Sequence, residues 1–267
     1  MEKPAISVVM SVYNGERFLR EAMDSILGQT LEDIELIVVD DGSTDHSRQI
    51  LAAVADRRLR VIEQPHQGLA TALNRGIDQA RADLIARMDA DDVSQRERLE
   101  KQYRFLQRNA AVALVGTAAR IVDYAGAEIG AWHPPGDHAS ISRRMIRANQ
   151  FAHPTVMFRK EAFRAAGGYR QDMLFAQDYD LWLRMTPRFQ VANLEEMLLI
   201  RRIGPDQFGT RRETLQIRCA VKARVEALMR GDYPVSQAVD LLRPLISAAV
   251  PGTVRRLGRK IFGRDRG

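Results

Sequence analysis

The chain has 267 residues, of which 45% are hydrophobic and 28% charged, and its formal net charge is +6. This composition is ordinary for a globular protein, so we do not expect a disordered chain, and the single cysteine, Cys219, excludes an internal disulfide framework and suits a reducing compartment. No stretch of about 18 apolar residues predicts a membrane-spanning helix, and we expect no signal peptide because the N-terminal apolar stretch is short.

Short apolar runs alternate with helix-like segments in the first third of the chain. The runs are 5–12, 34–40, 59–64 and 83–89, and apolar residues at helical spacing follow the first three. Strands of this kind, separated by helices, predict a parallel sheet covered on both faces. Ligands of such sheets bind beyond the carboxyl ends of the strands.

Polar clusters follow three of these predicted strands, with the sequences SVYN at 11–14, DDGS at 40–43 and DADD at 89–92. Because the carboxyl ends of parallel strands meet at one edge of a sheet, we expect the three clusters to lie together. No GxGxxG follows the first strand and no GxxxxGK[ST] occurs, which argues against a dehydrogenase-type dinucleotide site and a P-loop.

The pattern changes beyond about residue 110. Two strands flanking Tyr124, Ala125 and Gly126 suggest an antiparallel pair. We then expect a helix near 138–148, a strand near 155–158, helices near 160–166 and 176–186, and helix from about 211 onward, interrupted at Pro234 and Pro251.

The segment Asp89-Ala90-Asp91-Asp92 places three carboxylates directly after a predicted buried strand. Like charges this close repel, and carboxylates are expensive to desolvate. A divalent cation together with substrate phosphates offsets that repulsion, and Mg²⁺ or Mn²⁺ suits oxygen ligands. The alternative is a solvated acidic turn that caps a helix beginning near Gln95.

Five segments carry a family resemblance: ISVVMSVYNGERFLREAMDSILGQT, ELIVVDDGSTD, HQGLATALNRGI, ARMDADD and AQDYDLWLR. Their order and spacing resemble those of the inverting GT-A glycosyltransferases of family 2, of the bacterial cell-surface polysaccharide type. The resemblance implies an α/β fold with a Rossmann-like, mostly parallel sheet and helices on both faces. It also implies a nucleotide-sugar donor and Mn²⁺ or Mg²⁺ as cofactor.

The same resemblance suggests a division of the chain. We expect a GT-A domain at 1–210, with a nucleotide-binding half at 1–110 and an acceptor half at 111–210. A helical, basic C-terminal extension would follow at 211–267.

On the donor side, Ser11 and Tyr13 resemble the positions that hold the base, Tyr13 by stacking on it. Asp41 resembles the carboxylate that accepts a hydrogen bond from N3–H of uracil or thymine. The alternative for Asp40 and Asp41 is a turn with an Asx cap.

In the carboxylate cluster, Asp91 resembles the residue that binds the metal. Asp89 resembles the residue on the ribose side of the donor, and it would also be a second, indirect contact of the metal. Asp92 more often caps or supports in such motifs. Arg87 is placed to balance this charge or approach the diphosphate, although an exposed arginine at a strand end is an equal alternative.

Asp178 resembles the catalytic base that takes the proton of the attacking sugar hydroxyl. The alternative is an acidic residue that only stabilises the first turn of a helix, a role that Asp180 fits better. Many relatives have Glu where this chain has Gln177, and many carry a His-x-x-Ser element that is absent here. If that histidine assists metal or diphosphate binding in the relatives, Arg201, Arg202 or Gln207 must substitute for it here.

Two further residues are candidates for the acceptor side. His153 lies before a proline in a segment that resembles the approach to the acceptor, where a structural turn histidine is the alternative. Trp132 offers a platform for stacking a sugar, and a partly buried core aromatic is the alternative.

The basic charge is concentrated at the C-terminal end. Residues 201–267 hold 15 Lys/Arg and 6 Asp/Glu, a surplus of +9, against −3 for residues 1–200. As a helix, 250–264 would place Val254, Leu257, Ile261 and Phe262 on one side and its arginines and Lys260 on the other, a pattern typical of helices on anionic membrane surfaces. Docking on the domain is the alternative, and we expect no nucleic-acid partner.

We therefore expect an inverting glycosyltransferase that moves a sugar, with UDP as the expected carrier, to a saccharide or lipid-linked saccharide acceptor. Its expected location is the cytoplasm, including the inner face of the plasma membrane. Two alternatives stay open: a nucleotidyltransferase, and a catalytically silent nucleotide-binding assembly protein at the membrane.

Overall fold

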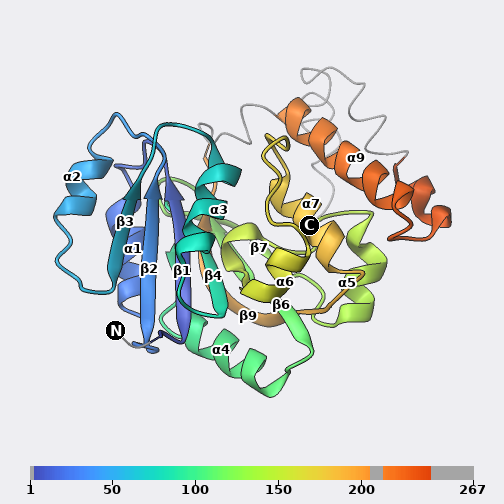
Figure 1. Cartoon of the computed structure of the whole chain (residues 1–267), viewed down its shortest axis with the longest axis horizontal. Coiled ribbons are helices and arrows are strands. Elements are labelled where there is room, and N and C mark those ends of the chain that lie inside the picture. The colour runs from blue at the N-terminus through green and yellow to red at the C-terminus, as the bar shows by residue number, and fades with distance from the viewer. Residues whose placement is uncertain (1–2, 205–212, 242–267) are drawn as a thin grey trace.

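The computed structural model describes residues 3–204 and 213–241, shown in Figure 1. Within these ranges nine strands form one sheet with the order β3-β2-β1-β4-β8-β6-β9-β5, and β7 pairs with β6. The strands are β1 (Ile6–Val12), β2 (Ile34–Asp40), β3 (Leu59–Glu63), β4 (Leu84–Asp89), β5 (Val93–Ser94), β6 (Val112–Val122), β7 (Glu128–Trp132), β8 (Met157–Arg159) and β9 (Gln190–Arg202). The helices are α1 (Leu19–Leu27), α2 (Ser47–Ala52), α3 (Leu69–Gln79), α4 (Arg98–Arg108), α5 (His138–Met145), α6 (Lys160–Ala165), α7 (Gln177–Met185) and α9 (Glu213–Met229), with 3-10 turns η1 (His153–Thr155) and η2 (Val235–Leu241).

The first four strands form the predicted parallel sheet, with β1 at its centre between β2 and β4. In the register of these strands Ser11 lies opposite both Val39 and Asp89, and Val12 lies opposite Asp40. The expectation that the polar clusters share one rim is therefore confirmed. The strand order reverses between β1 and β4, which is where open α/β sheets bind their ligands.

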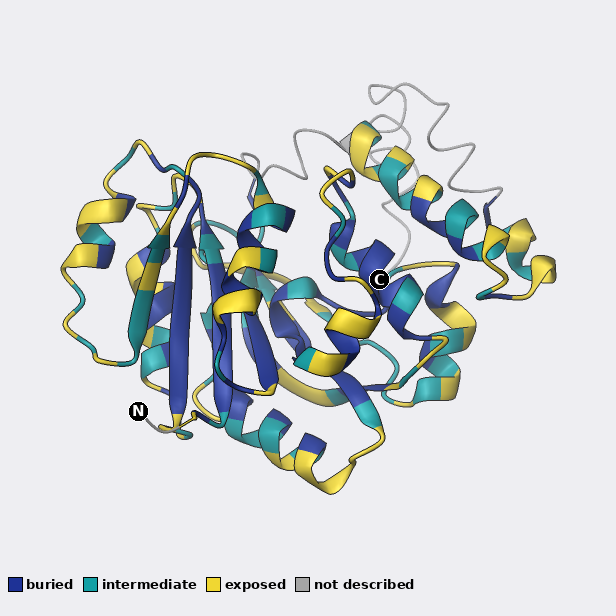
Figure 2. Ribbon diagram, viewed as in Figure 1, coloured by how far each residue is buried: buried dark blue, intermediate teal, exposed yellow. Residues whose placement is uncertain are grey.

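Alternate residues of these strands pack on opposite faces of the sheet. In β1, Val8 and Met10 belong to the core cluster that contains Leu19 and Met23 of α1, whereas Val9 belongs to the cluster that contains Leu73 of α3. Figure 1 shows α3 in front of the sheet and α1 behind it. Because both faces are covered, β1, β2 and β4 are buried along most of their length (Figure 2) and appear in the sequence as continuous apolar runs, whereas the edge strand β3 is only partly buried.

The second half of the sheet mixes directions. β8 pairs antiparallel with β4 and with β6, so one continuous sheet crosses the boundary predicted near residue 110. The predicted antiparallel pair around Tyr124 is β6 and β7. Strand β9, which the sequence patterns did not single out, runs parallel to β6 through several shifts of register.

The described part of the C-terminal region is helical, as expected. Ala223 and Ala227 of α9, with Tyr233 after it, join the core cluster that contains Trp182 of α7. The basic helix predicted at 250–264 lies outside the described residues, as does Gln207. None of the described helices is long and apolar enough to cross a bilayer.

Candidate active site

Three carboxylates lie together where the chain leaves β4. Oxygens of Asp89, Asp91 and Asp92 lie within 4.8 Å of one another, Asp92 being buried and the other two partly buried. Strand β4 fixes Asp89 at the rim, and the short strand β5 begins directly after Asp92. Three carboxylates at this spacing provide the hard oxygen ligands that Mg²⁺ and Mn²⁺ prefer.

Asp92 gives a specific reason to expect a cation here. Its Oδ1 accepts a hydrogen bond of 2.8 Å from the backbone N–H of Arg202, and its Oδ2 is buried with no hydrogen-bond partner in the described part of the chain. Burial raises the pKa of Asp92 well above its ordinary value, and the charges of Asp89 and Asp91 raise it further. A divalent cation beside these oxygens relieves both effects, so the residues present fit one.

A buried arginine lies behind the carboxylates. Arg87 of β4 is only 2% exposed and forms an ion pair with Asp89. Arg98, at the start of α4, is also buried, and it donates hydrogen bonds to the carbonyl oxygens of Arg87 and Pro154. Burial lowers the pKa of Arg98 to about 9. Arg87 is therefore a buried residue of the site and not an exposed strand end.

The end of β9 supports the acidic turn from the other side. Arg202 donates from its guanidinium to the carbonyl oxygen of Asp91 (2.8 Å) and pairs with Glu21 of α1 (2.7 Å). Its guanidinium also lies 4.5 Å from the centre of the Phe18 ring. The charge of the neighbouring Arg201 opposes the rise in the pKa of both Asp92 and Asp178. Whether these arginines replace the missing histidine stays a prediction.

On the donor side, Asp41 follows β2 and is buried. Its Oδ1 accepts hydrogen bonds from the Gln64 amide (2.6 Å) and from the backbone N–H of Gln67 (2.9 Å), and its Oδ2 accepts from the backbone N–H of Gly68 (2.8 Å). The Nδ1 of His66 lies 2.9 Å from the same Oδ2. Asp41 therefore anchors the loop that leads into α3.

An aromatic pair lies beside this anchor. The ring of Tyr13, which is 49% exposed, stacks on His66 with centres 4.0 Å apart and planes 29° apart. Ser11 lies two residues earlier in β1, opposite Asp89. Asp40 is fully buried and accepts hydrogen bonds from Ser43 N–H (3.0 Å) and from Arg48 (2.7 Å), which fixes the turn.

Asp178 lies in the first turn of α7, partly buried. Its Oδ2 accepts a hydrogen bond of 3.0 Å from the side-chain amide of Asn149. Burial raises the pKa of Asp178, while hydrogen bonds from Tyr179 N–H and Asn149 and the charge of Arg87 oppose that rise. The neighbouring Asp180 is instead fully buried and paired with Arg184 at 2.7 Å.

The acceptor-side candidates lie in different places. The Nε2 of His153 lies 2.8 Å from the Tyr169 hydroxyl. Burial raises the pKa of Tyr169, and the charges of Asp178 and Asp89 add to the rise, so the hydroxyl that His153 contacts lies within electrostatic reach of both carboxylates. Trp132 packs instead against the core cluster on the α1 face, and its indole N–H has no partner among the described residues.

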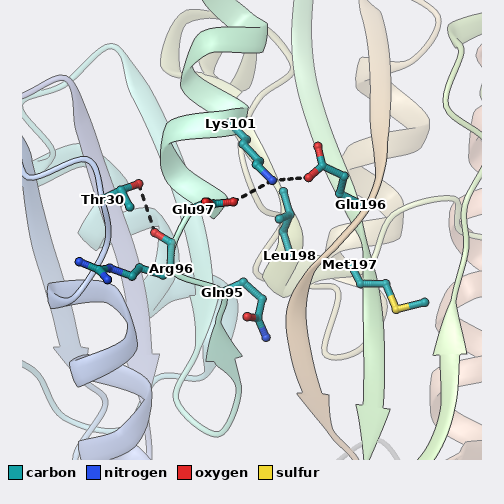
Figure 3. A pocket seen from close by; sticks show the side chains of 8 residues that line it. All are labelled: Thr30, Gln95, Arg96, Glu97, Lys101, Glu196, Met197 and Leu198. Carbon is teal, nitrogen blue, oxygen red and sulfur yellow. Dashed lines mark hydrogen bonds and ion pairs between the residues drawn. The ribbon is translucent and has the colours of Figure 1, made fainter.

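A separate open hollow of about 530 Å³ lies at the beginning of α4 (Figure 3). Its one ammonium group, on Lys101, is paired with both Glu97 and Glu196. The hollow reaches Leu198 of β9, which precedes Arg202 by four residues. Because Arg202 contacts the carboxylate turn, this separation is about 13 Å along the strand. It is therefore distinct from the rim described above.

Comparison with known proteins agrees with this geometry. The family model described as "Glycosyl transferase family 2" matches residues 7–167, which is more than half of the chain. The chain belongs to glycosyl transferase family 2. Asp178 and α9 lie beyond the matched residues of this glycosyltransferase.

Two curated relatives extend the match. The glycosyltransferase is 36% identical to EpsE of Bacillus subtilis over 258 residues, which cover 94% of this chain and 91% of EpsE. It is also 36% identical over 204 residues to the O-antigen biosynthesis glycosyltransferase WbnJ of Escherichia coli, covering 74% of this chain and 79% of WbnJ.

Solved structures show the same fold at low identity. The mannosyltransferase PcManGT from Pyrobaculum calidifontis, in complex with GDP-Man and Mn²⁺, superposes with a TM-score of 0.69 at 17% identity, over 98% of this chain and 81% of that one. Residues 1–349 of S. aureus TarS, in complex with UDP-GlcNAc, give 0.63 at 18% identity, over 94% and 83%. The predicted GT-A type of α/β fold is therefore confirmed.

Several residues of the site were not found from the sequence. Asn149 bonds to Asp178, Arg98 lies buried beneath Arg87, and Tyr169 meets His153. Asn149 and Tyr169 fall inside the segment that resembles the approach to the acceptor, but nothing in their spacing distinguished them. Arg98 occupies a helix start among other charged residues, where exposure is the ordinary expectation.

Proposed function

We propose that this glycosyltransferase transfers a sugar from a UDP-sugar to a hydroxyl group of a saccharide or lipid-linked saccharide, with inversion at the anomeric carbon. One observation carries the proposal. Arg87, which is buried at the end of β4, pairs with Asp89, and its charge also opposes the rise in the pKa of Asp178. Because one buried cation acts on both carboxylates, it supports a donor phosphate side at Asp89 and a proton-accepting side at Asp178.

The donor would lie along the ends of β1 and β2. In this role Ser11 and the exposed face of Tyr13 hold the base, and Asp41 exchanges the hydrogen bond from Gln64 for one from the base N3–H. The solved complexes of TarS with UDP and with UDP-GlcNAc support a uracil carrier, whereas that of PcManGT contains GDP-Man.

Asp91 would hold the divalent cation directly, with Asp89 as a second, indirect contact that also faces the ribose. When bound, Mn²⁺ or Mg²⁺ neutralises the charge that develops on the leaving diphosphate. Arg87 and Arg201 supply further fixed positive charge around it. Arg202 keeps the Asp91 backbone in place.

Asp178 would act as the base. It takes the proton of the acceptor hydroxyl while that oxygen bonds to the anomeric carbon and the bond from that carbon to the diphosphate breaks. A carboxylate with a raised pKa suits this role, because its proton affinity approaches that needed near neutral pH. One displacement of this kind inverts the anomeric carbon.

The acceptor would approach from α5 and η1, near His153, with Trp132 as a more distant candidate. Arg143, Arg144 and Arg147 are exposed there, and no acidic residue except Asp137 lies within 133–152. This charge supports an acceptor that carries phosphate, as lipid-linked saccharides do. It also fits a location on the cytoplasmic side of an anionic membrane, with 250–264 as the contacting segment.

Two variants test the reaction. Asp178→Asn should abolish sugar transfer and retain UDP binding, and Asp91→Asn should abolish the extra stabilisation that Mn²⁺ gives to the UDP complex in a thermal-shift assay. Absence of transfer by the unmutated chain with every nucleotide sugar would favour the silent binding protein. Stabilisation by UDP that does not depend on metal would contradict the role of Asp91.

The membrane contact has its own test. The full chain should float with vesicles containing anionic lipid, and a chain ending at residue 250 should not. Equal flotation of the two chains would remove the C-terminal segment from the proposal.

A further inference from the structure

Helix α9 lies outside the residues that match the family model, yet it packs beside α7, whose first turn contains Asp178 (Figure 1). Ala223 and Ala227 face the core cluster around Trp182. Two polar side chains of α9 act on the first turn of α7: Arg224 bonds directly to Tyr179, and Glu226 pairs with Arg170, which in turn pairs with Asp180.

The first contact is a buried junction at the Tyr179 hydroxyl. Arg224, which is 9% exposed, donates from Nε to that oxygen at 2.9 Å. The hydroxyl therefore accepts from Arg224, and its own proton is directed to the carbonyl oxygens of Met145 and Ile146 at the end of α5. Three segments, α9, α7 and the end of α5, thus meet at one oxygen atom.

The consequence for Asp178 comes from both sides of this junction. Tyr179 adjoins Asp178 and its backbone N–H bonds to that carboxylate. Asn149, which lies three residues beyond Ile146, donates the 3.0 Å hydrogen bond to Asp178 Oδ2. The junction therefore sets the position of the carboxylate and of its amide partner at the same time.

The second contact between α9 and α7 involves Asp180, the residue that follows Tyr179. Arg170 lies 3.4 Å from Oδ1 of the buried Asp180 and also pairs with Glu226 of α9. Lys222 of α9 pairs with Asp172 at 3.0 Å, and Asp172 binds Arg170 at 2.7 Å. The first turn of α7 is thus held from α9 on two successive residues.

We propose that α9 positions the base: Arg224, acting through the Tyr179 hydroxyl, holds Asp178 and Asn149 in the geometry that proton transfer needs. This inference rests on the proposed role of Asp178. It makes Arg224 a positioning residue, and it assigns part of the C-terminal extension to the catalytic reaction in addition to any contact with a membrane.

The test compares Arg224→Met, Tyr179→Phe and the double variant with Arg218→Met, a matched change at an exposed position of the same helix. Each single variant should lower kcat by about tenfold, because small displacements of a catalytic group are costly. The KM for the donor and the affinity for UDP should stay unchanged, and the acidic limb of the kcat–pH profile should move to higher pH. Arg224→Lys, which retains a donor, should restore part of kcat.

The double variant distinguishes the positioning of Asp178 by Arg224 from two independent effects of the substitutions on the enzyme. If Arg224 acts through the hydroxyl, the double variant should be no slower than the slower single variant. The inference is overturned if both single variants lower the melting temperature but keep the kcat and pH profile of Arg218→Met, or if the losses multiply. Tyr179→Phe retains the buried ring, so it decides the question even if Arg224→Met does not fold.

Asp178→Asn measured alongside separates this inference from the function on which it rests. Full transfer by Asp178→Asn would refute the base itself. Loss of transfer in Asp178→Asn with normal kcat in Tyr179→Phe and Arg224→Met would leave the base in place and refute only the role of α9.

Discussion

Replacement of Asn149 by alanine should move the acidic limb of the activity profile. The amide of Asn149 donates a 3.0 Å hydrogen bond to Asp178 Oδ2 and so favours the ionised carboxylate, which lowers its pKa against the effect of burial. A hydrogen bond to a charged group is worth about 1.5–3 kcal/mol net, and the partial exposure of Asp178 favours the lower end. At 1.36 kcal/mol per unit, the pKa should rise by about one.

The direction in which the acidic limb moves follows from the role of Asp178 as the base. Asp178 must be ionised to accept a proton, so a higher pKa means that activity is lost earlier as the pH falls. The assay is release of the nucleoside diphosphate at saturating donor and acceptor across the pH range, giving kcat at each pH. Asn149→Asp, which places a second carboxylate beside Asp178, should move the limb further in the same direction.

Asn109→Ala provides the control, because its amide bonds only to the end of α4, at the carbonyl oxygen of Phe105. Its acidic limb should coincide with that of the unmutated enzyme. An Asn149→Ala profile that also coincides, with kcat lowered equally at every pH, would refute the claim that this hydrogen bond tunes the base.

Three further outcomes are expected. Gly76→Ala should lower the stability by about 1–3 kcal/mol, because a Cβ there would lie 2.6 Å from Val9 Cγ1, whereas Gly130→Ala, with nothing within 4 Å, should leave the melting temperature unchanged. Tyr13→Ala should weaken UDP binding about tenfold or more in a calorimetric titration, since stacking on a base is worth about 1–3 kcal/mol; unchanged affinity would exclude that stacking. Removal of divalent metal by a chelator should abolish transfer and added Mn²⁺ should restore it, and activity that survives chelation would contradict the metal role of Asp91.

The first half of the fold and its acidic rim were predictable because their signals are local. Strands β1, β2 and β4 are buried on both faces, so each appears as an apolar run that ends in polar residues. Strand β9 gave no such signal. Its residues 195–197 are all exposed where the register with β6 jumps between Thr117 and Ala118, so the alternation of a strand is lost at that point.

The sequence by itself determined that acidic side chains leave the ends of parallel strands, because strand periodicity and the carboxyl-end rule act within a few neighbouring residues. Only the tertiary structure decided which other groups complete the site. Arg202 reaches Asp92 because β9 pairs with β5 and β6, Asn149 reaches Asp178 through the packing of α7, and Arg98 at the start of α4 reaches the carbonyl oxygen of Pro154. Such contacts join residues that are far apart in the chain, so no local sequence pattern predicts them.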